Sequence, residues 1–195
     1  MDGLLPGFPE PVLDSQRVFR AVLDAMALPG SLADLPLHVT APAPLDAATA
    51  AVLLALADVE TPVWLDGASD NDGVRRHLRF HCGCPLTPDA GAADFAVVTE
   101  PAAMPALSAF KAGTDEYPDR SATLVVQVPT LSKGERWTLS GPGIRDRAQL
   151  SPGGLPAGFR DWLAENRAAF PRGVDVIFTS GRRLAALPRT TRLEG

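Results

Sequence analysis

Apolar positions along the chain recur with two periods, one helical and one extended. Helical spacing between capping and stopping residues predicts helices at residues 14–28, 45–57, 71–80, 102–111 and 157–169. Alternating or continuous apolar runs bounded by Pro and Gly predict strands at residues 31–39, 62–65, 94–98, 121–128 and 136–140, and two more within 170–187. The chain therefore reads as an α/β protein.

The first helix should begin at a cap formed by Asp14 or Ser15 and end at Pro29-Gly30. Its expected buried face consists of Val18, Phe19, Val22, Leu23 and Met26. The strand at 31–39 contains Pro36, which has no N–H to donate, so this strand is expected at an edge of the sheet.

The order of the elements predicts the layers. The run at 94–98 is continuously apolar, as in a strand covered on both faces. Residues 121–128 are expected to pair with residues 136–140 as a hairpin across Lys133-Gly134. Alternating helices and strands followed by hairpins predict a three-layer α/β/α sandwich with a mixed sheet. One domain should span residues 1–195, with residues 1–11 as an extended arm.

The composition suits a soluble globular domain. The 195 residues are 46% hydrophobic and 21% charged, enough to bury a core without disulfides. No run of about 18 apolar residues predicts a membrane span, and the first residues do not resemble a signal peptide. Cys82 and Cys84 are too close in sequence to bridge each other readily. Together these features favour the cytoplasm.

Charge is distributed unevenly along the chain. The formal net charge is −5, yet residues 120–195 hold 12 of the 18 basic and 6 of the 23 acidic side chains, a net of +6. This half could attract phosphate-like anions or an acidic partner, or its charges could simply be solvated. Nucleic-acid binding is disfavoured, because basic runs with interleaved aromatic residues are missing.

Arg79 and His81 stand at the expected end of one helix. A cation beside a titratable imidazole could bind a phosphorylated ligand, with His81 as a general base, or His81 could be a capping or core residue. The stretch His81-Cys82-Gly83-Cys84 contains residue types that bind metals. Zinc usually needs two separated ligand pairs, however, and His38 and His77 show no paired spacing, so no metal is expected.

The C-terminal segment offers a second candidate site. Arg189 and Thr190 follow the last expected strand, and an arginine fork suits phosphate or phosphonate oxygens. The alternative is a surface arginine at a terminus. Asp175 lies within an apolar strand and needs a partner if it is buried, which Arg172, Arg183 or Arg189 could supply as a structural ion pair.

Two glycines and two lysines complete the candidates. The amides of Gly141 and Gly143 could face an anion after a strand, or the segment could be a sharp turn. A Lys-Ser/Thr pair does not follow, so this is not a nucleotide-hydrolase phosphate loop. Lys111 and Lys133 are the only lysines, which leaves few candidates for the Schiff base of a pyridoxal phosphate enzyme.

Short segments in a shared order run almost from end to end. They include Gln16-x-x-Phe19-Arg20, residues 61–65, residues 78–81, residues 139–144 and Pro188-Arg189-Thr190-Thr191. In order and spacing these segments resemble the PhnH family, subunits of the bacterial carbon–phosphorus lyase system for phosphonate breakdown.

The resemblance implies a function as well as a fold. It implies a fold like that of pyridoxal-phosphate-dependent transferases without the cofactor, homodimerisation, and a complex with the G, I and J subunits. That complex forms ribose 1-phosphonate 5-triphosphate from ATP and a phosphonate and releases adenine, so ATP is its substrate and this chain holds no cofactor. The family supplies no catalytic residue to carry over. The alternative is a stand-alone binding module or small enzyme for phosphorylated ligands, a phosphonate or a nucleotide, that uses Arg79, His81 and Arg189.

Overall fold

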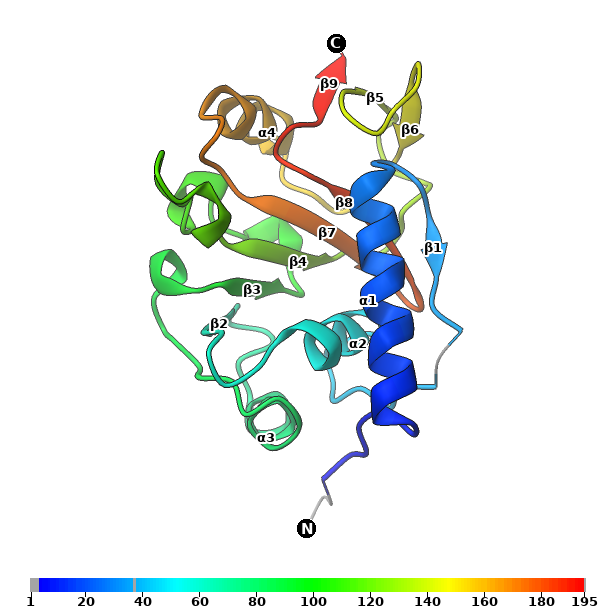
Figure 1. The fold of residues 1–195 in the computed structure, drawn as a ribbon, viewed down its shortest axis with the longest axis vertical. Coiled ribbons are helices and arrows are strands. Elements are labelled where there is room, and N and C mark those ends of the chain that lie inside the picture. The colour runs from blue at the N-terminus through cyan, green and yellow to red at the C-terminus, as the bar shows by residue number, and fades with distance from the viewer. Residues whose placement is uncertain (1–3, 37, 195) are drawn as a thin grey trace.

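A six-stranded sheet forms the centre of the molecule (Figure 1). The structure, a computed structural model, describes residues 4–36 and 38–194, so three residues of the expected arm and Leu37 of an expected strand lie outside it. The sheet order is β1 (Ala33–Asp34), β8 (Arg183–Leu187), β7 (Asp175–Ser180), β4 (Thr123–Gln127), β3 (Phe95–Val98) and β2 (Val63–Leu65). The strands β2, β3, β4 and β7 are parallel, and β8 runs antiparallel to both of its neighbours, β7 and β1. The predicted mixed sheet is confirmed.

Three helices cover one face of this sheet. They are α1 (Pro11–Ala27), α2 (Ala47–Leu56) and α3 (Asp72–His81). Val18 of α1 and Val52 of α2 pack with Val125 and Ile177, which are fully buried on neighbouring strands. The helix α3 joins the same layer beside α2 and packs near β2 and β3 through Leu78. Burial of these apolar side chains is the main force that holds this layer to the sheet.

The opposite face has a mixed cover instead of a helical layer. It consists of α4 (Phe159–Ala168), 3-10 turns at Pro101–Ala103 and Leu107–Ala109, and an antiparallel sheet of β6 (Ala148–Leu150), β5 (Trp137–Ser140) and β9 (Arg192–Glu194). The helix expected at 102–111 is divided into the two turns, because Pro105 between them cannot donate a helical hydrogen bond. The α/β class therefore holds, with a second outer layer built from several kinds of element.

The expected hairpin between residues 121–128 and 136–140 is wrong. The strand β4 lies between β3 and β7, so both of its edges are already occupied. The strand β5 pairs with β6 and β9 in the smaller sheet. Gly134, the expected hairpin turn, donates its N–H to the carbonyl of Ser151. A third strand, β9, also follows the two that were expected to close the chain.

The helix α1 begins three residues before its expected start. Pro11 occupies the first helical turn, where its missing N–H costs nothing, and the Asp14 carboxylate accepts a hydrogen bond from the Glu10 N–H at 3.0 Å. Its buried positions include Val18 and Val22, but Phe19 and Leu23, expected inside, are about half exposed. Before it, residues 4–10 run without helix or strand, as expected for the arm.

The other boundaries fall close to the predicted ones. Asn71 caps α3, because its side-chain oxygen accepts from the Val74 N–H at 3.1 Å. The edge strand expected at 31–39 is reduced to Ala33–Asp34. None of the helices within the described ranges combines the length and apolar content needed to cross a membrane.

Candidate functional site

The carboxyl ends of parallel strands are the usual place for ligands in an open α/β sheet. Here that edge carries Asp66, directly after β2, and its carboxylate is buried. It accepts hydrogen bonds from the backbone of Ser69 at 2.9 Å, Thr99 at 2.7 Å and Glu100 at 2.8 Å. Burial raises the pKa of Asp66, but the hydrogen bonds from Ser69, Glu100 and Thr99 outweigh it, and the pKa lies below its ordinary value. Asp66 therefore ties the loops after β2 and β3 together.

We expect Asp66→Asn to lower the free energy of unfolding by about 2 kcal/mol, measured by urea denaturation. Both carboxylate oxygens face donors, so the new amide NH2 must oppose one of them. Asp70→Asn is the matched control, because the Asp70–Arg75 ion pair is partly exposed and should contribute less than about 1 kcal/mol. Equal losses in the two variants would contradict this role of Asp66.

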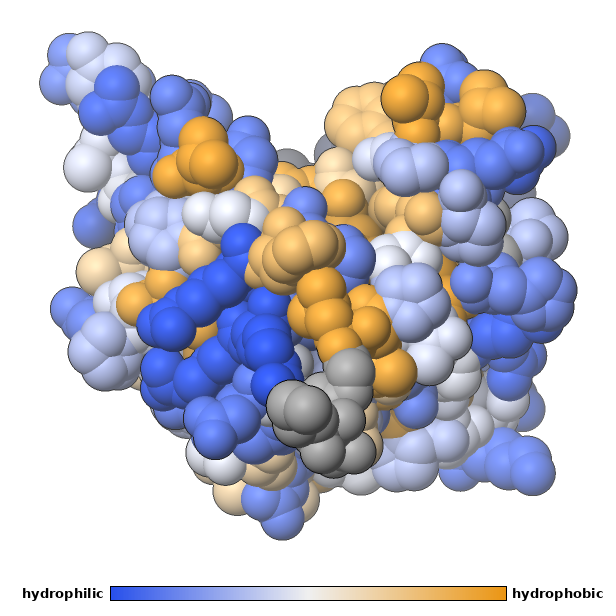
Figure 2. Space-filling view, turned by 90° about the horizontal axis from the view of Figure 1, so that it is seen from below, coloured by the Kyte–Doolittle hydropathy of each residue, from blue (hydrophilic) through white to orange (hydrophobic). Residues whose placement is uncertain are grey.

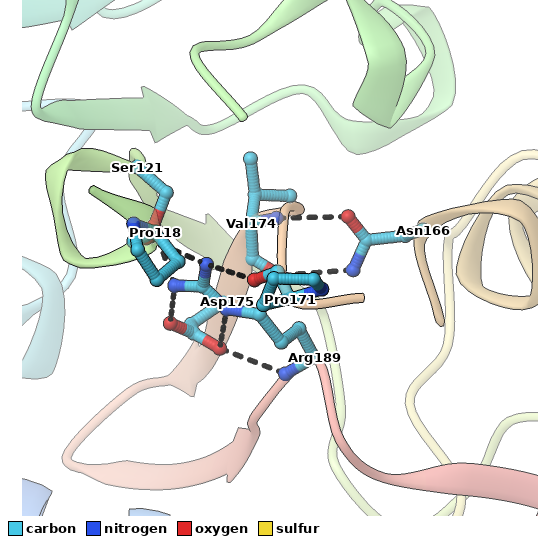
Figure 3. Close-up of polar contacts among 7 residues, drawn as sticks. All are labelled: Pro118, Ser121, Asn166, Pro171, Val174, Asp175 and Arg189. Atoms are coloured by element: carbon cyan, nitrogen blue, oxygen red, sulfur yellow. Dashed lines mark hydrogen bonds and ion pairs between the residues drawn. The ribbon is translucent and has the colours of Figure 1, made fainter. Parts of the chain in front are cut away.

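Asp175 and Arg189 form a partly buried ion pair at the amino end of β7 (Figure 3). The Nη2 atom donates to Asp175 Oδ2 at 2.6 Å, and the Arg189 backbone N–H donates to Asp175 Oδ1 at 2.7 Å. The guanidinium also donates to the carbonyls of Pro118 and Pro171 and to the Ser121 hydroxyl. The predicted ion pair is confirmed, with Arg189 as the partner that sequence left open.

The surroundings of Arg189 leave little space for a ligand. The cavity beside it, lined also by Thr191 and Asn166, has a volume of about 10 Å³, which is room for about one water molecule. The binding of a phosphate or phosphonate by Arg189 and Thr190 stays a prediction. The contacts favour a clamp that joins β7, the segment after β8, and the loops that contain Pro118 and Pro171.

Gly141 and Gly143 form the turn after β5. Gly143 has a φ of 80°, and an added Cβ would lie 2.0 Å from the Ala27 carbonyl oxygen at the end of α1. Gly141 has a φ of 132°, and a Cβ there would meet the Thr190 carbonyl oxygen at 3.1 Å. Both glycines are therefore explained by backbone packing, and their predicted role in anion binding remains untested.

The helix α3 borders a cavity with a volume of about 530 Å³. Its walls are residues of the N-terminal arm (Leu4 and Leu5), of the loop before α2 (Pro42 and Ala43) and of α3 (Asp72, Gly73, Arg76 and His77). The arm is held against α3 by His81: its Nε2 lies 2.9 Å from the Leu5 carbonyl oxygen. A carbonyl oxygen only accepts, so Nε2 is the nitrogen that donates.

His77 lies in the wall of this cavity, next to His81. Their ring centroids are 4.5 Å apart, and the His77 side chain is 1% exposed. Neither of its ring nitrogens has a hydrogen-bond partner among the described residues. Burial, with a smaller contribution from the charge of His81, lowers the pKa of His77 to about 4. At neutral pH His77 is thus a neutral imidazole with one free donor and one free acceptor.

The outer side of α3 is basic. Arg79 borders a shallower depression together with Asp72, Arg75, Arg76 and Phe80. Arg75 is paired with Asp70, whereas Arg76 and Arg79 form no ion pair with any described residue. The helix α3 lies at the lower end of the molecule in Figure 1, and Figure 2 views that end, where a hydrophilic area borders an apolar strip.

The cysteines after α3 are turned toward the core. Cys84 is buried, and the Cys82 thiol donates to the Leu53 carbonyl oxygen at a sulfur–oxygen distance of 3.6 Å. The hydrogen bond to Cys84, together with burial, raises the pKa of the Cys82 thiol, which makes it a weak nucleophile. Within the described ranges, no group of three or more His, Cys, Asp and Glu side chains is placed to hold a metal ion.

The sequence-predicted residues thus fall into two separate places. Arg79 and His81 lie beside the cavities along α3. Asp175, Arg189, Thr190 and the two glycines lie near the start of β7, after β8 and after β5, and Figure 1 shows these strands away from α3. Sequence reasoning missed His77 and Arg76. The statement that His77 shows no paired spacing was wrong, since it stands four residues before His81 on one helix and the rings touch.

One family model and two relatives match this chain, and they agree on the family. The family model described as bacterial phosphonate metabolism protein (PhnH) matches residues 6–194. The alpha-D-ribose 1-methylphosphonate 5-triphosphate synthase subunit PhnH of Rhizobium meliloti (strain 1021) is 43% identical over 187 residues, 96% of this chain and 94% of the relative. A protein of Stutzerimonas stutzeri named "Putative C-P lyase subunit protein HtxG" is 40% identical over 81 residues, 42% of each chain.

Proposed function

Because the chain belongs to the PhnH family of bacterial phosphonate metabolism proteins, we propose that it is a subunit of the carbon–phosphorus lyase core complex. In that complex it supports the formation of ribose 1-phosphonate 5-triphosphate from ATP and a phosphonate, with release of adenine. The observation that carries the proposal is the 43% identity to a synthase subunit over 96% of this chain. The match covers nearly the whole chain, so the proposal concerns the whole fold and not one segment of it.

The side-chain geometry supports an accessory role. Asp66, the buried carboxylate at the carboxyl edge of the sheet, is already hydrogen-bonded by backbone N–H groups. The Cys82 thiol has a raised pKa and faces the Leu53 carbonyl. A nucleophile needs a base within hydrogen-bond reach. Among the described residues, the hydrogen-bond partners of Cys82 and Asp66 supply no such base. We therefore assign turnover to the assembled complex.

The exposed face of α1 supports docking onto another subunit. Val12, Phe19 and Leu23 lie along one side of the helix and are 81%, 52% and 46% exposed. Val12 and Phe19, together with Ser15, border an open groove that Ala55 of α2 also lines. An apolar stripe of this kind is typical of a protein–protein contact. We propose that it contacts one of the G, I or J subunits of the complex.

Co-expression tests this assignment. The tagged chain is expected to copurify with the G, I and J subunits, and Phe19→Glu with Leu23→Glu should reduce their recovery at least about tenfold, since a charge is then buried at the contact. Val59→Glu is the matched control, because Val59 is also exposed but lies in a turn outside α1. Unchanged recovery with the α1 variant, at unchanged thermal stability, would contradict the assignment.

The proposal includes the finer properties implied by the family. They are a cytoplasmic location, a homodimer of the isolated chain, ATP as a substrate of the complex, and a fold resembling that of pyridoxal-phosphate-dependent transferases without the cofactor. Lys111 supports the last point, because its Nζ donates to Asp94 at 2.6 Å and is engaged in an ion pair. Pyridoxal phosphate followed by borohydride should leave the mass of the chain unchanged, and a stable adduct on Lys111 would count against the point.

A further inference from the structure

The cavity beneath the N-terminal arm combines groups that recognise different parts of one molecule. The side chains of Leu4, Leu5 and Pro42 give it apolar walls. Arg76 adds a cation at the border shared with the outer depression, and Asp72 adds a carboxylate that can only accept hydrogen bonds. A volume of about 530 Å³ lies within the roughly 300–1,000 Å³ typical of pockets for small organic ligands.

His77 shows that this cavity is suited to a polar occupant. Its side chain is 1% exposed, and both ring nitrogens are without partners among the described residues. A buried polar group without a partner destabilises the fold, so each such group calls for an explanation, and a bound molecule that supplies the missing partner is one. At neutral pH the imidazole is uncharged, with a pKa of about 4, and it can offer one donor and one acceptor.

The charged groups around the cavity narrow the class of ligand. Arg76 and Arg79 form no ion pair with described residues, and planar guanidinium groups suit phosphate oxygens. Asp72 would repel an anion placed against it, but it can accept hydrogen bonds from sugar hydroxyls. A free inorganic phosphate would use the arginines and leave the apolar walls, Asp72 and His77 unused.

We propose that the cavity between α3, the loop at Pro42 and the N-terminal arm binds a phosphate ester that carries hydroxyl groups, of the size of a sugar phosphate or mononucleotide. The phosphate lies toward Arg76, at the border with the outer depression that Arg79 also lines. The hydroxyls donate to Asp72, and the uncharged end lies toward His77 between the apolar walls. This site deepens the proposed function, and it rests on that function because the complex would supply or consume such esters. Binding itself concerns this chain alone.

The N-terminal arm forms one wall of the site and lies against His81. His81 donates to the Leu5 carbonyl at 2.9 Å, and a Cβ on Gly7 would lie 2.8 Å from His81 Nδ1. Gly7 therefore allows the arm to lie directly against the His81 ring. Occupation of the cavity should hold the arm in this position, because Leu4 and Leu5 would then contact the ligand.

Calorimetric titration of the purified full-length chain tests the proposal. Ribose 5-phosphate, AMP and inorganic phosphate are the probes. At least one of the two esters should bind at millimolar or lower concentration, and inorganic phosphate at least about tenfold more weakly. AMP alone would identify a mononucleotide site, and similar binding of both esters would identify a sugar phosphate site. If neither ester binds, or phosphate binds as well as they do, the proposal is overturned.

Variants assign the binding to these residues. His77→Leu should reduce ester binding at least about tenfold while the melting temperature stays unchanged or rises by several degrees, because two unpartnered polar atoms leave the interior. Arg76→Ala should weaken binding comparably. Arg145→Ala, which also removes an exposed arginine, should have no effect. Normal binding by His77→Leu, or a marked fall in its melting temperature, would contradict the role of His77.

The outcome is separable from that of the proposed function. Copurification with the other subunits does not depend on His77, which lies inside the chain. A chain that joins the complex but binds neither ester keeps the proposed function and loses this site. A chain that binds an ester alone but never joins the complex keeps the site and loses the subunit role.

Discussion

Replacement of Arg189 by alanine is expected to lower the free energy of unfolding by about 3–5 kcal/mol, the usual loss when one member of a buried ion pair is removed. The Asp175 carboxylate would keep its backbone donor, the Arg189 N–H, but would lose the guanidinium. The carbonyls of Pro118 and Pro171 and the Ser121 hydroxyl would lose their donor as well. Urea denaturation of the isolated chain measures the difference.

Arg172→Ala is the matched control for Arg189→Ala. Its ion pair with Asp115 lies near the same loops, yet both side chains are more than half exposed, so the loss should be at most about 1 kcal/mol. If Arg189→Ala is as stable as Arg172→Ala, then the guanidinium does not hold the fold, and a ligand-binding role for Arg189 would gain support. A loss of several kcal/mol supports the clamp.

The second large effect is a loss of stability in acid that depends on His77. Its pKa is about 4 in the folded chain and about 6.5 when unfolded. Because the unfolded state takes up the proton first, stability is complete above pH 6.5 and falls as the pH drops toward 4. A shift of this size corresponds to about 3 kcal/mol.

The variant His77→Leu isolates this effect from the other titrating groups. The free energy of unfolding of wild type, measured from pH 7.5 down to about pH 4, should fall more steeply than that of His77→Leu. The difference should grow to about 3 kcal/mol at the acid end. His81, which contacts His77, and Asp72 and Arg76, which line the same cavity, remain in both proteins. Parallel curves would show that His77 keeps its ordinary pKa in the folded chain.

Much of the fold could be predicted because local patterns and tertiary packing agree. The strand predicted at 121–128 is the central strand β4, and the predicted cap Asn71 sets the start of α3. The hairpin with residues 136–140 was missed because pairing partners are decided by the sheet as a whole. The strand β4 is covered on both edges by β3 and β7, which lie far away in sequence.

Side-chain exposure was less predictable than the elements themselves. Phe19 and Leu23 have the helical spacing of buried residues. The structure shows instead that α1 packs Val18 and Val22 against the sheet and leaves Phe19 and Leu23 about half exposed. On an apolar helix, hydrophobicity alone does not separate the core face from a docking face. The exposed face with Phe19 and Leu23 is the one that supports the proposed contact with a partner subunit.

The candidate site was found in part. Arg79 and His81 were singled out at a helix end, and the structure places them beside the cavities along α3. His77 could have been found from its position four residues before His81. The cavity could not, because the N-terminal arm and the loop at Pro42 that form its walls lie far from α3 in sequence. Long-range contacts of this kind leave no local pattern.

We propose that this chain works within the complex and does not turn over substrate on its own. Adenine release from ATP and methylphosphonate, measured by chromatography, tests this for the proposed G, I and J partner subunits with this chain, without it, and for this chain alone. We expect release with the full set, a loss of at least about tenfold without the chain, and none from the chain alone. Adenine release by the isolated chain, or a full rate in its absence, would contradict it.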